Sequence, residues 1–440
     1  MPLDRPALLD RFRRSRARTR ALFDLLDPRA YDDRPIPLRN PIVFYEGHLP
    51  AFAINTLVKR ALGRPGIDEQ LETIFARGID PDVEAAAVAR GNPAWPAREV
   101  VLAYAAEADR VLEDVLANAD LERHDRPLLR GAEALWTILE HEDMHQETLA
   151  YMWHQLPYAS KRKPGHYLTC PPRLRTAPAA SRVPISAGTV TLGTADEEGF
   201  AWDNERPGHR VNVDAFAIDA HNVTNAAFMA FVDAGGYRDP RWWRPGDWAW
   251  ISGEGISHPS FWEQDDGRWY WRGMFERVSL PESWPVYVTW AEARAYAAWS
   301  GARLPAEAEF HRAAYGTATG QERRFPWGDT LRGAVPANCD FHRWDPEPIG
   351  THPDGASAFG VHDLVGNGWE WTSTVFAPFP GFQPMASYPE YSADFFDQDH
   401  FVLKGASPVT ARALLRRGFR NWFRPRYPYV YATFRCVSPS

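Results

Sequence analysis

Residues 128–156 read LLRGAEALWTILEHEDMHQETLAYMWHQL, an unbroken segment long enough for a helix of about six turns or more. The segment contains His141 and His145, which lie four positions apart and therefore on one face of such a helix. Two histidines in that arrangement can bind one metal ion. The segment predicts both a long helix and part of a metal site.

Three other segments with helical spacing precede this one, near residues 6–26, 42–62 and 98–119. In the third of them, apolar residues recur at steps of three and four, as expected for one face of a helix: Val101, Ala105, Ala108, Leu112 and Leu116. Together the four segments predict a four-helix bundle in the first part of the chain.

A third metal ligand has to come from another helix. Glu147 is six residues past His141 and points away from the histidine face. His48 is the best candidate, because it lies among apolar and aromatic residues in NPIVFYEGHLPAFAINTL, residues 40–57. Three neutral histidines with open coordination positions suit Fe(II) that binds O2, or catalytic Zn(II). The residue types alone do not choose between these two metals.

The same letters also match the H-E-x-x-H pattern of zinc hydrolases, in which Glu142 would be the general base. One form of that pattern needs a histidine at position 151, where this chain has Tyr151. Another form needs a carboxylate on a following helix, but the chain runs into a proline-rich stretch. These departures weaken the zinc hydrolase interpretation, which is kept as the alternative to an iron enzyme.

The amino-acid composition and the spacing of apolar residues change after the long helix. Residues 157–184 are rich in proline and arginine without periodicity, which is typical of a linker. From residue 185 onward, short strands and dense Gly, Pro, Asn and Asp are expected, with helices at 289–302 and 305–316. The predicted organisation is a helical domain at 1–160, a linker at 161–184 and a second domain at 185–440.

Composition limits the classes of function. The 440 residues carry a formal net charge of −8, which argues against a nucleic-acid binder. No run of 18 apolar residues exists, so no membrane span is expected. The three cysteines (Cys170, Cys339 and Cys436) are too few and too scattered for a disulfide framework. The basic N-terminal stretch lacks the apolar core of a secretory signal, so a cytoplasmic protein is expected.

The second half carries a series of motifs that resembles a known family. The motifs are ERPGHRVNVDAFAIDAHNVTNAAFMAFVDAGGY (205–237), WPVYVTWAEARAYAAWSGARLPAEAEFHRAAYG (284–316), FPWGD (325–329), GNGWEWTST (366–374), VLKGAS (402–407), RRGFRNWFRP (416–425) and FRCV (434–437). They are similar to the formylglycine-generating-enzyme/sulfatase-modifying-factor domain, a C-type-lectin-related fold. That resemblance implies an α+β protein, with a DinB-like four-helix bundle in front.

Formylglycine chemistry itself is not expected. The formylglycine-generating enzymes use a pair of cysteines near the end of the chain, and this sequence has only Cys436 there. Cys436 lies in the framework segment FRC, where a buried structural thiol is expected. The glycines and tryptophans of GNGWEW are expected to be architectural.

A helical bundle with three histidines followed by this domain resembles the ergothioneine-synthase family, the EgtB-like sulfoxide synthases. The resemblance covers almost the whole chain. It implies that His48, His141 and His145 hold a non-haem iron, and that the enzyme uses O2 to join a sulfur donor to C2 of the imidazole of hercynine. It also places the active site between the bundle and the second domain.

The resemblance also implies residues for substrates and for proton transfer. A tyrosine in SYPEYSADFF, either Tyr388 or Tyr391, would donate a proton. Aromatic faces suit the quaternary ammonium of hercynine, and a few polar groups suit its imidazole. The expected substrate-binding residues are Gln146, Arg420, Asn421, Trp422 and Phe423.

Phe423 departs from the family pattern. Ergothioneine enzymes that take γ-glutamylcysteine commonly carry an aspartate at this position, and a phenylalanine cannot pair with an ammonium group. A donor that presents hydroxyl groups fits better, as in the sister branch of selenoneine synthases (SenA), which use the selenosugar 1-seleno-β-D-glucose. The segment PLRNPIVFYEGHLPAFAINTL (37–57) also looks like that branch.

The preferred function is therefore C–Se bond formation. The competing hypotheses are a thiol-using ergothioneine enzyme and a non-catalytic lectin-like module.

Overall fold

A computed structural model describes residues 3–76, 95–165, 167, 178–195, 199–331 and 333–439. The chain forms two compact units. The first consists of Met1–Gly165 with Pro384–Tyr391, and the second of His166–Gln383 with Ser392–Ser440. The expected division at residues 161–184 therefore needs a correction, because a short segment of the second half belongs to the helical unit. Much of the expected linker, including Cys170, lies outside the described residues.

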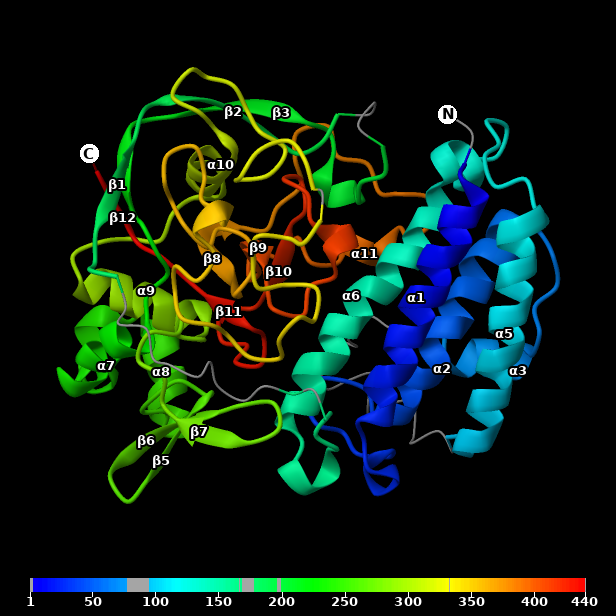
Figure 1. Cartoon of the computed structure of the whole chain (residues 1–440), viewed down its shortest axis with the longest axis horizontal. Helices are drawn as coiled ribbons and strands as arrows, with labels where there is room; N and C mark the ends of the chain where they lie inside the picture. Colours follow the sequence, from blue (N-terminus) through cyan, green and yellow to red (C-terminus); the bar gives the residue numbers. More distant parts are fainter. Residues whose placement is uncertain are drawn as a thin grey trace. The chain divides into compact units, whose positions relative to one another are not determined.

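The first unit is built around the four predicted helices, which are confirmed: α1 (Arg5–Asp24), α2 (Ile42–Ala53), α5 (Arg98–Asn118) and α6 (Glu133–Gln155). A short helix, α3 (Glu69–Ile74), is added to them. In Figure 1, α6 and α1 run side by side, and α2 and α5 follow to their right. Leucine, valine and phenylalanine side chains from these helices form one buried core.

Helix α6 begins five residues later than the sequence pattern suggests. Residues Pro127–Ala132 form a 3-10 segment in which Gly131 has φ 61° and Ala132 has φ 56°. Glycine adopts this left-handed conformation without a steric penalty, so the chain turns there and then enters the helix. The remaining helix of 23 residues still carries both histidines on one face.

Helix α2 is buried along its whole length, from Ile42 to Ala53. Pro50 lies inside it and cannot donate the usual backbone hydrogen bond to the carbonyl of Glu46. The helix then continues as a π-helical stretch, η2 (Ile54–Ala61). π-Helical turns are rare and occur frequently at functional sites. Here the irregular part begins six residues after His48.

Within its described residues, the second unit contains four small sheets. Their strands are, in chain order, β1 (Arg182–Ile185), β2 (Gly188–Leu192), β3 (His209–Val213), β4 (Phe216–Asp219), β5 (Trp262–Asp265), β6 (Arg268–Arg272), β7 (Arg277–Ser279), β8 (Gly368–Val375), β9 (Phe401–Ala406), β10 (Asn421–Phe423), β11 (Ala432–Thr433) and β12 (Val437–Pro439). The orders are β1-β4-β12, β10-β9-β8-β11, β2-β3 and β5-β6-β7. The first and last strands of the unit therefore both pair with β4.

Among the described residues, the helices that follow in this half of the chain are α7 (Asn225–Asp233), α8 (Pro245–Glu254), α9 (Trp290–Trp299), α10 (Glu307–Tyr315) and α11 (Glu390–Ala393), and α11 begins in the segment that belongs to the first unit. Helices α9 and α10 confirm the two helices expected at 289–302 and 305–316. Helix α10 packs against β2, β3, β8 and β9 (Figure 1). The strands are short and are joined by long loops, as the dense Gly and Pro of the sequence indicated.

A buried ion pair explains two of the family motifs. Arg435 and Glu370 have fully buried side chains and form a two-pronged pair with N–O distances of 2.7 Å. Arg435 stands in FRCV and Glu370 in GNGWEW. Removal of one partner would leave an uncompensated buried charge. These motifs hold the fold together, and the neighbouring Cys436 is buried as expected.

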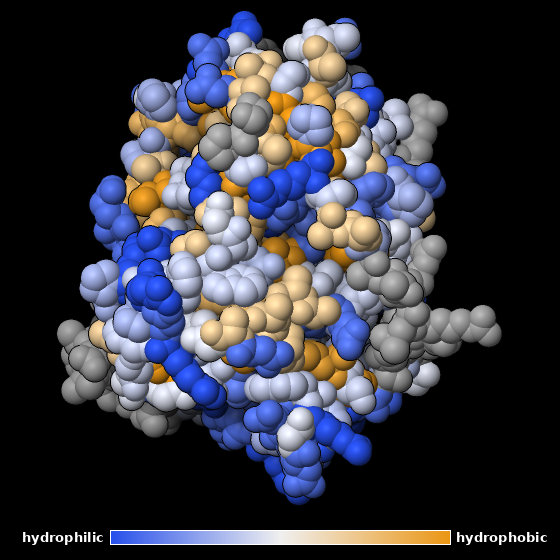
Figure 2. Space-filling model, turned by 90° about the vertical axis from the view of Figure 1, so that its left-hand side faces the viewer, coloured by the Kyte–Doolittle hydropathy of each residue, from blue (hydrophilic) through white to orange (hydrophobic). Residues whose placement is uncertain are grey.

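One face of the molecule has an ordinary mixture of side chains. On the face shown in Figure 2, hydrophobic side chains form small patches among hydrophilic ones. Within the described ranges, no helix combines the length and the apolar character needed to span a bilayer.

Candidate active site

Three histidine rings meet in the first unit, one from α2 and two from successive turns of α6. One ring nitrogen from each of His48, His141 and His145 lies within 4.8 Å of the other two. The Nε2 atoms of His48 and His141 are 3.3 Å apart. In the part of the chain that the structure describes, no other group of three or more His, Cys, Asp or Glu side chains has such spacing. The structure therefore brings together the three histidines expected from the sequence.

Burial keeps these rings neutral. It lowers the pKa of His48 to about 4, and it lowers the pKa of His141 and of His145 well below the usual value. The proximity of the other histidines adds to the effect on both α6 residues. A neutral imidazole is the form that offers a lone pair to a metal.

Neighbouring groups fix the orientation of the rings. The Nδ1–H of His48 donates to the carbonyl oxygen of Phe75 at 2.7 Å, which leaves Nε2 as the atom with a lone pair. The ring of Phe52 stacks on His141 with centroids 3.6 Å apart and an interplanar angle of 9°. The ring of Phe44 stacks on His48 at 4.9 Å. The site is thus held in place by its surroundings.

The spacing fits a single metal ion. Two nitrogens that each lie about 2.1 Å from one ion, at an angle of about 100°, are roughly 3.2 Å apart. The observed Nε2–Nε2 distance of 3.3 Å between His48 and His141 agrees with this value. Three histidines also leave other coordination positions open for small ligands.

The position of Glu142 corrects the zinc hydrolase hypothesis. Its Oε1 accepts a hydrogen bond from the hydroxyl of Thr19 at 2.6 Å, and its Oε2 pairs with Arg16 at 3.1 Å. Both partners belong to α1, and the Glu142 carboxylate is buried against them. One residue of an α-helix turns by about 100°, so Glu142 faces away from its neighbour His141. The carboxylate is a structural partner of α1 and is not placed to act as a general base.

Gln146 needs a similar correction. Its Nε2 donates to the carbonyl and the hydroxyl of Ser15 and to the hydroxyl of Thr19, at 2.9–3.1 Å. The side chain is fully buried against α1. It follows His145 directly and therefore points toward a different helix. The expectation that Gln146 binds the imidazole of the substrate is wrong in this structure.

The segment Pro384–Tyr391 is held in the first unit by several hydrogen bonds. Arg60 donates to two successive carbonyl oxygens of the segment at 3.1 Å each. Glu133 accepts the backbone N–H of Ser387 at 2.8 Å. The hydroxyls of Thr137 and Ser387, both fully buried, share a hydrogen bond of 2.8 Å. Because Ser387 directly precedes Tyr388, these contacts fix the position of the backbone that carries Tyr388.

Both candidate tyrosines lie close to the histidines. The ring of Tyr388 is 6.1 Å from that of His141 and 5.2 Å from that of Phe52, measured between centroids. The hydroxyl of Tyr391 donates to the Sδ of Met144 at 3.1 Å. The structure thus brings Tyr388 and Tyr391 to the same cluster as the metal-ligand candidates.

Met144 is a member of this cluster that the sequence did not predict. It lies three residues after His141 and therefore shares the histidine face of α6. That spacing was the available signal, but a methionine on an apolar helix is usually a core residue. Its contact with Tyr391 places a soft, polarizable sulfur beside the tyrosine hydroxyl.

The other expected substrate residues lie on β10 in the second unit. Successive side chains of a strand point to opposite faces, so Asn421 and Phe423 share one face and Trp422 lies on the other. Trp422 stacks on Phe376 with centroids 4.2 Å apart and an angle of 5°. Phe423 stacks on Tyr427 at 5.2 Å. All three β10 side chains are half-buried.

Arg420 is a structural residue, which corrects its assignment to the substrate. Its side chain is 2% exposed and forms a two-pronged ion pair with Glu307 at 3.0 and 3.1 Å. It also donates to the backbone carbonyls of Asn204 and Ala377. These contacts engage all three guanidinium nitrogens, so the group cannot also bind a substrate without breaking the pair.

Two family descriptions match the chain. Residues 169–439 match the sulfatase-modifying factor enzyme 1-like domain. Residues 11–149 match the DinB superfamily. The expected combination of a DinB-like bundle with a formylglycine-generating-enzyme-like domain is thereby confirmed.

Several characterised proteins are similar over much of the chain. A hercynine oxygenase of Mycolicibacterium thermoresistibile is 37% identical over 438 residues, covering 96% of this chain and 92% of that protein. A hercynine oxygenase of Mycolicibacterium smegmatis is 39% identical over 305 residues, which cover 68% of this chain and 70% of that protein. Ergothioneine biosynthesis protein 1 of Neurospora crassa is 28% identical and covers 92% of this chain and 54% of its own length.

Proposed function

The chain belongs to the EgtB-like family of hercynine oxygenases, and we propose that it uses Fe(II) and O2 to join 1-seleno-β-D-glucose to C2 of the imidazole of hercynine. In this reaction, the C2 hydrogen of hercynine and the hydrogen of the selenol are lost. A C–Se bond forms, and O2 takes up the two electrons together with the two protons that are released. The observation that carries the proposal is the cluster of three neutral histidines, two buried and one half-buried, beside two tyrosines.

The histidines supply the metal-binding part of the proposal. His48, His141 and His145 would hold Fe(II) through one ring nitrogen each. When bound, Fe(II) supplies open positions at which O2 and a soft selenolate or thiolate can be brought together. The stacked rings of Phe44 and Phe52 shield two of the ligands and keep their orientation fixed.

In the proposed reaction, the tyrosine hydroxyls are the proton donors. A phenol hydroxyl is a suitable general acid when it lies near the reacting atoms. Tyr388 packs beside the ligand His141, and Tyr391 reaches the neighbouring Met144. We assign the main proton donation to the Oη of Tyr388, because its ring is the one beside a metal-ligand candidate.

Two residues of β10 supply contacts to hercynine. The Oδ1 of Asn421 accepts the backbone N–H of Trp422 at 2.9 Å, which fixes the amide and leaves its Nδ2 to donate to an imidazole nitrogen. The indole of Trp422 offers an aromatic face for the trimethylammonium group, which cannot form hydrogen bonds. The stack on Phe376 holds that indole in one orientation.

Phe423 supports a selenosugar as the donor. It stands where enzymes that use γ-glutamylcysteine would place an aspartate, and its ring lies flat against Tyr427. This aromatic surface offers no charge to an amino-acid headgroup. It suits the apolar C–H face of a pyranose, whose hydroxyl groups carry no charge.

A product assay tests the proposed function. The protein is loaded with Fe(II) under anaerobic conditions and given hercynine, O2 and one donor at a time, with mass spectrometry of the products. We expect a hercynyl–selenosugar adduct from 1-seleno-β-D-glucose and little product from γ-glutamylcysteine or cysteine. Product mainly from the amino-acid thiols would favour an ergothioneine-type synthase, which the similarity to hercynine oxygenases also permits. Absence of any hercynine product would contradict both functions.

The substitution Phe423→Asp should change the choice of donor. A carboxylate at this position could pair with the ammonium group of γ-glutamylcysteine, and a charge-assisted contact is worth enough to shift relative kcat/KM roughly ten-fold or more toward that thiol. The measurement is a competition assay with both donors present. Phe423→Leu is the matched control, because it removes the ring without adding a charge. A preference unchanged by Phe423→Asp would remove this residue from the donor site.

The substitution Glu133→Ala should slow the reaction without releasing the metal. It leaves the backbone N–H of Ser387 without its partner and loosens the segment that positions Tyr388. A small displacement of a reacting group costs roughly ten- to hundred-fold in rate. The measurements are single-turnover product formation and metal content. Glu99→Ala is the control, since Glu99 is an exposed glutamate in the first turn of α5. Loss of metal in Glu133→Ala, or an unchanged rate, would contradict the positioning role.

A further inference from the structure

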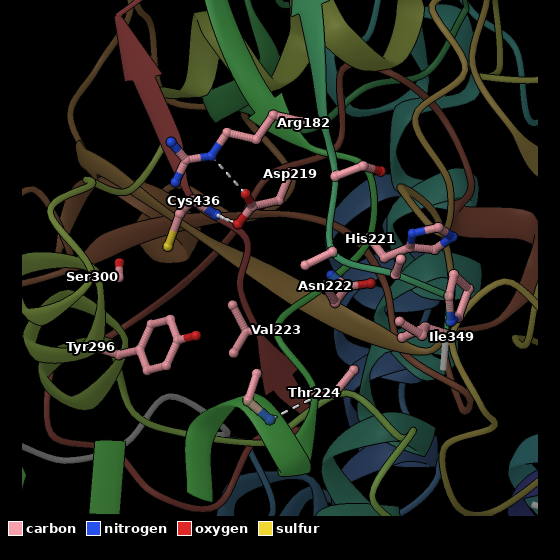
Figure 3. A pocket seen from close by; sticks show the side chains of 15 residues that line it. Arg182, Asp219, His221, Asn222, Val223, Thr224, Tyr296, Ser300, Ile349 and Cys436 are labelled. Atoms are coloured by element: carbon pink, nitrogen blue, oxygen red, sulfur yellow. Dashed lines mark hydrogen bonds and ion pairs between the residues drawn. The ribbon is translucent and has the colours of Figure 1, made fainter. Parts of the chain in front are cut away.

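The second unit contains a pocket of about 380 Å³ that the proposed chemistry does not use. It lies where β4 ends and the chain turns toward α7, and α9 forms another wall (Figure 3). Its volume falls within the range of about 300–1,000 Å³ that is usual for small-molecule sites. None of the histidines, tyrosines or β10 residues discussed above lines it.

The pocket holds a buried amide without a partner. Asn222 is 3% exposed, and neither its Nδ2 nor its Oδ1 forms a hydrogen bond within the described part of the chain. A buried amide that loses its bonds to water without gaining others destabilises the folded state. Nearby Thr224 does not relieve it: the Thr224 hydroxyl accepts the N–H of Ala227 and forms no hydrogen bond with the amide of Asn222. The unsatisfied amide indicates that something outside the chain completes it.

A second polar group of the pocket is the hydroxyl of Tyr296 in α9. Figure 3 shows it pointing toward the side of the pocket where Val223 and Asn222 lie. Its ring is fixed by packing against Phe228, with centroids 5.4 Å apart and an angle of 16°. Burial raises the pKa of Tyr296 to about 12, so the hydroxyl stays protonated and can donate. The pocket therefore offers a fixed phenol and an amide.

The charged groups of the pocket compensate each other. Asp219 accepts from the Nε of Arg182 at 3.1 Å and from the backbone N–H of Cys436 at 2.9 Å. Burial lowers the pKa of His221 to about 4, so this ring is neutral at physiological pH. A pocket with no unpaired charge selects against ions, since a buried charge needs a partner.

From these groups we propose that the pocket binds a neutral polyol of monosaccharide size. Hydroxyl groups of such a molecule can both donate to Oδ1 and accept from Nδ2 of Asn222, and can accept from Tyr296. Val223, Ala227 and Ile349 give the walls an apolar part for the C–H faces of a sugar ring. This inference does not depend on the proposed reaction.

Binding measurements on the full-length protein test the proposal. The probes are D-glucose, myo-inositol and glycerol, with uracil as a neutral heterocycle of a different class, followed by calorimetry or ligand-observed NMR. We expect saturable binding of at least one polyol, and we expect Tyr296→Phe and Asn222→Leu each to raise its Kd at least ten-fold. Tyr296→Phe removes a single oxygen, so it remains informative if the Asn222 variant fails to fold.

A variant of the histidine cluster separates this pocket from any sugar site near the metal. His48→Ala should leave the Kd of the polyol unchanged if binding takes place beside Asn222. Three results would overturn the proposal: no polyol binds, the pocket variants leave the affinity unchanged, or a crystal grown with saturating polyol shows ordered water only at Asn222. Preferential binding of uracil would also contradict it, because the ligand would then belong to another class.

Discussion

The substitution His48→Ala is expected to abolish iron binding and with it the formation of any hercynine product. His48 supplies one of three ring nitrogens that lie within 4.8 Å of one another, and it is the only one that comes from α2. Two histidines on one helix hold a metal ion far more weakly than three. We expect substoichiometric iron after anaerobic loading and a fall in product formation of roughly a thousand-fold or more.

The measurement is the metal content per chain by mass spectrometry, taken together with the product assay. His124→Ala is the control, because His124 is exposed and belongs to the same unit. A circular dichroism spectrum like that of the unsubstituted protein would show that the bundle remains folded. Full iron content in His48→Ala would contradict the assignment of His48 as a ligand.

The substitution Tyr388→Phe is expected to reduce bond formation by about a hundred- to ten-thousand-fold, the usual contribution of a general acid. It removes only the hydroxyl, so the packing of the ring against Phe52 and His141 should persist. Iron content and hercynine binding should therefore remain as in the unsubstituted protein. The pH dependence of the remaining activity should change as well, because the group that donates the proton is gone.

Tyr391→Phe is the comparison for this experiment. Its hydroxyl contacts the sulfur of Met144, so its loss should have a smaller effect than the loss of the Tyr388 hydroxyl. Single-turnover experiments with the two single variants and the double variant would rank the two groups. Equal activity in all three variants and the unsubstituted protein would remove tyrosine from the mechanism.

The helices and the pairing of two histidines on one helix face could be predicted from the sequence because both follow from local spacing. The step of four between His141 and His145 places them on one face of any helix, whatever that helix packs against. His48 was found because a histidine among aromatic and aliphatic residues needs a reason to be buried. No long-range information was required for either inference.

Glu142 and Gln146 could not be assigned correctly from the same helix. Nearly all residues of α6 between Ala134 and Trp153 are buried, so no polar stripe shows which side meets α1 and which meets α2. Polar residues on such a helix can equally be partners of a neighbouring helix or part of a site. The hydrogen bonds from α1 decide the question, and they connect residues more than a hundred positions apart.

Arg420 illustrates the same limit in the second unit. Its partner Glu307 lies 113 positions earlier, and the sequence around neither residue predicts the pair. An arginine beside a substrate-like motif is therefore ambiguous until the tertiary structure is available. The position of the tyrosine segment in the first unit is equally non-local, since residues 384–391 are flanked on both sides by the other unit.

That interruption has a consequence for protein engineering. A chimera that exchanges only residues 1–165 between two relatives would combine the histidines of one parent with the tyrosines of the other. The grafted surface formed by Arg60, Glu133 and Thr137 would then meet a foreign segment in place of its own Ser387. An exchange that also carries residues 384–391 would transfer the whole cluster. The transferable module of this protein is therefore discontinuous, and a single crossover in the gene divides it.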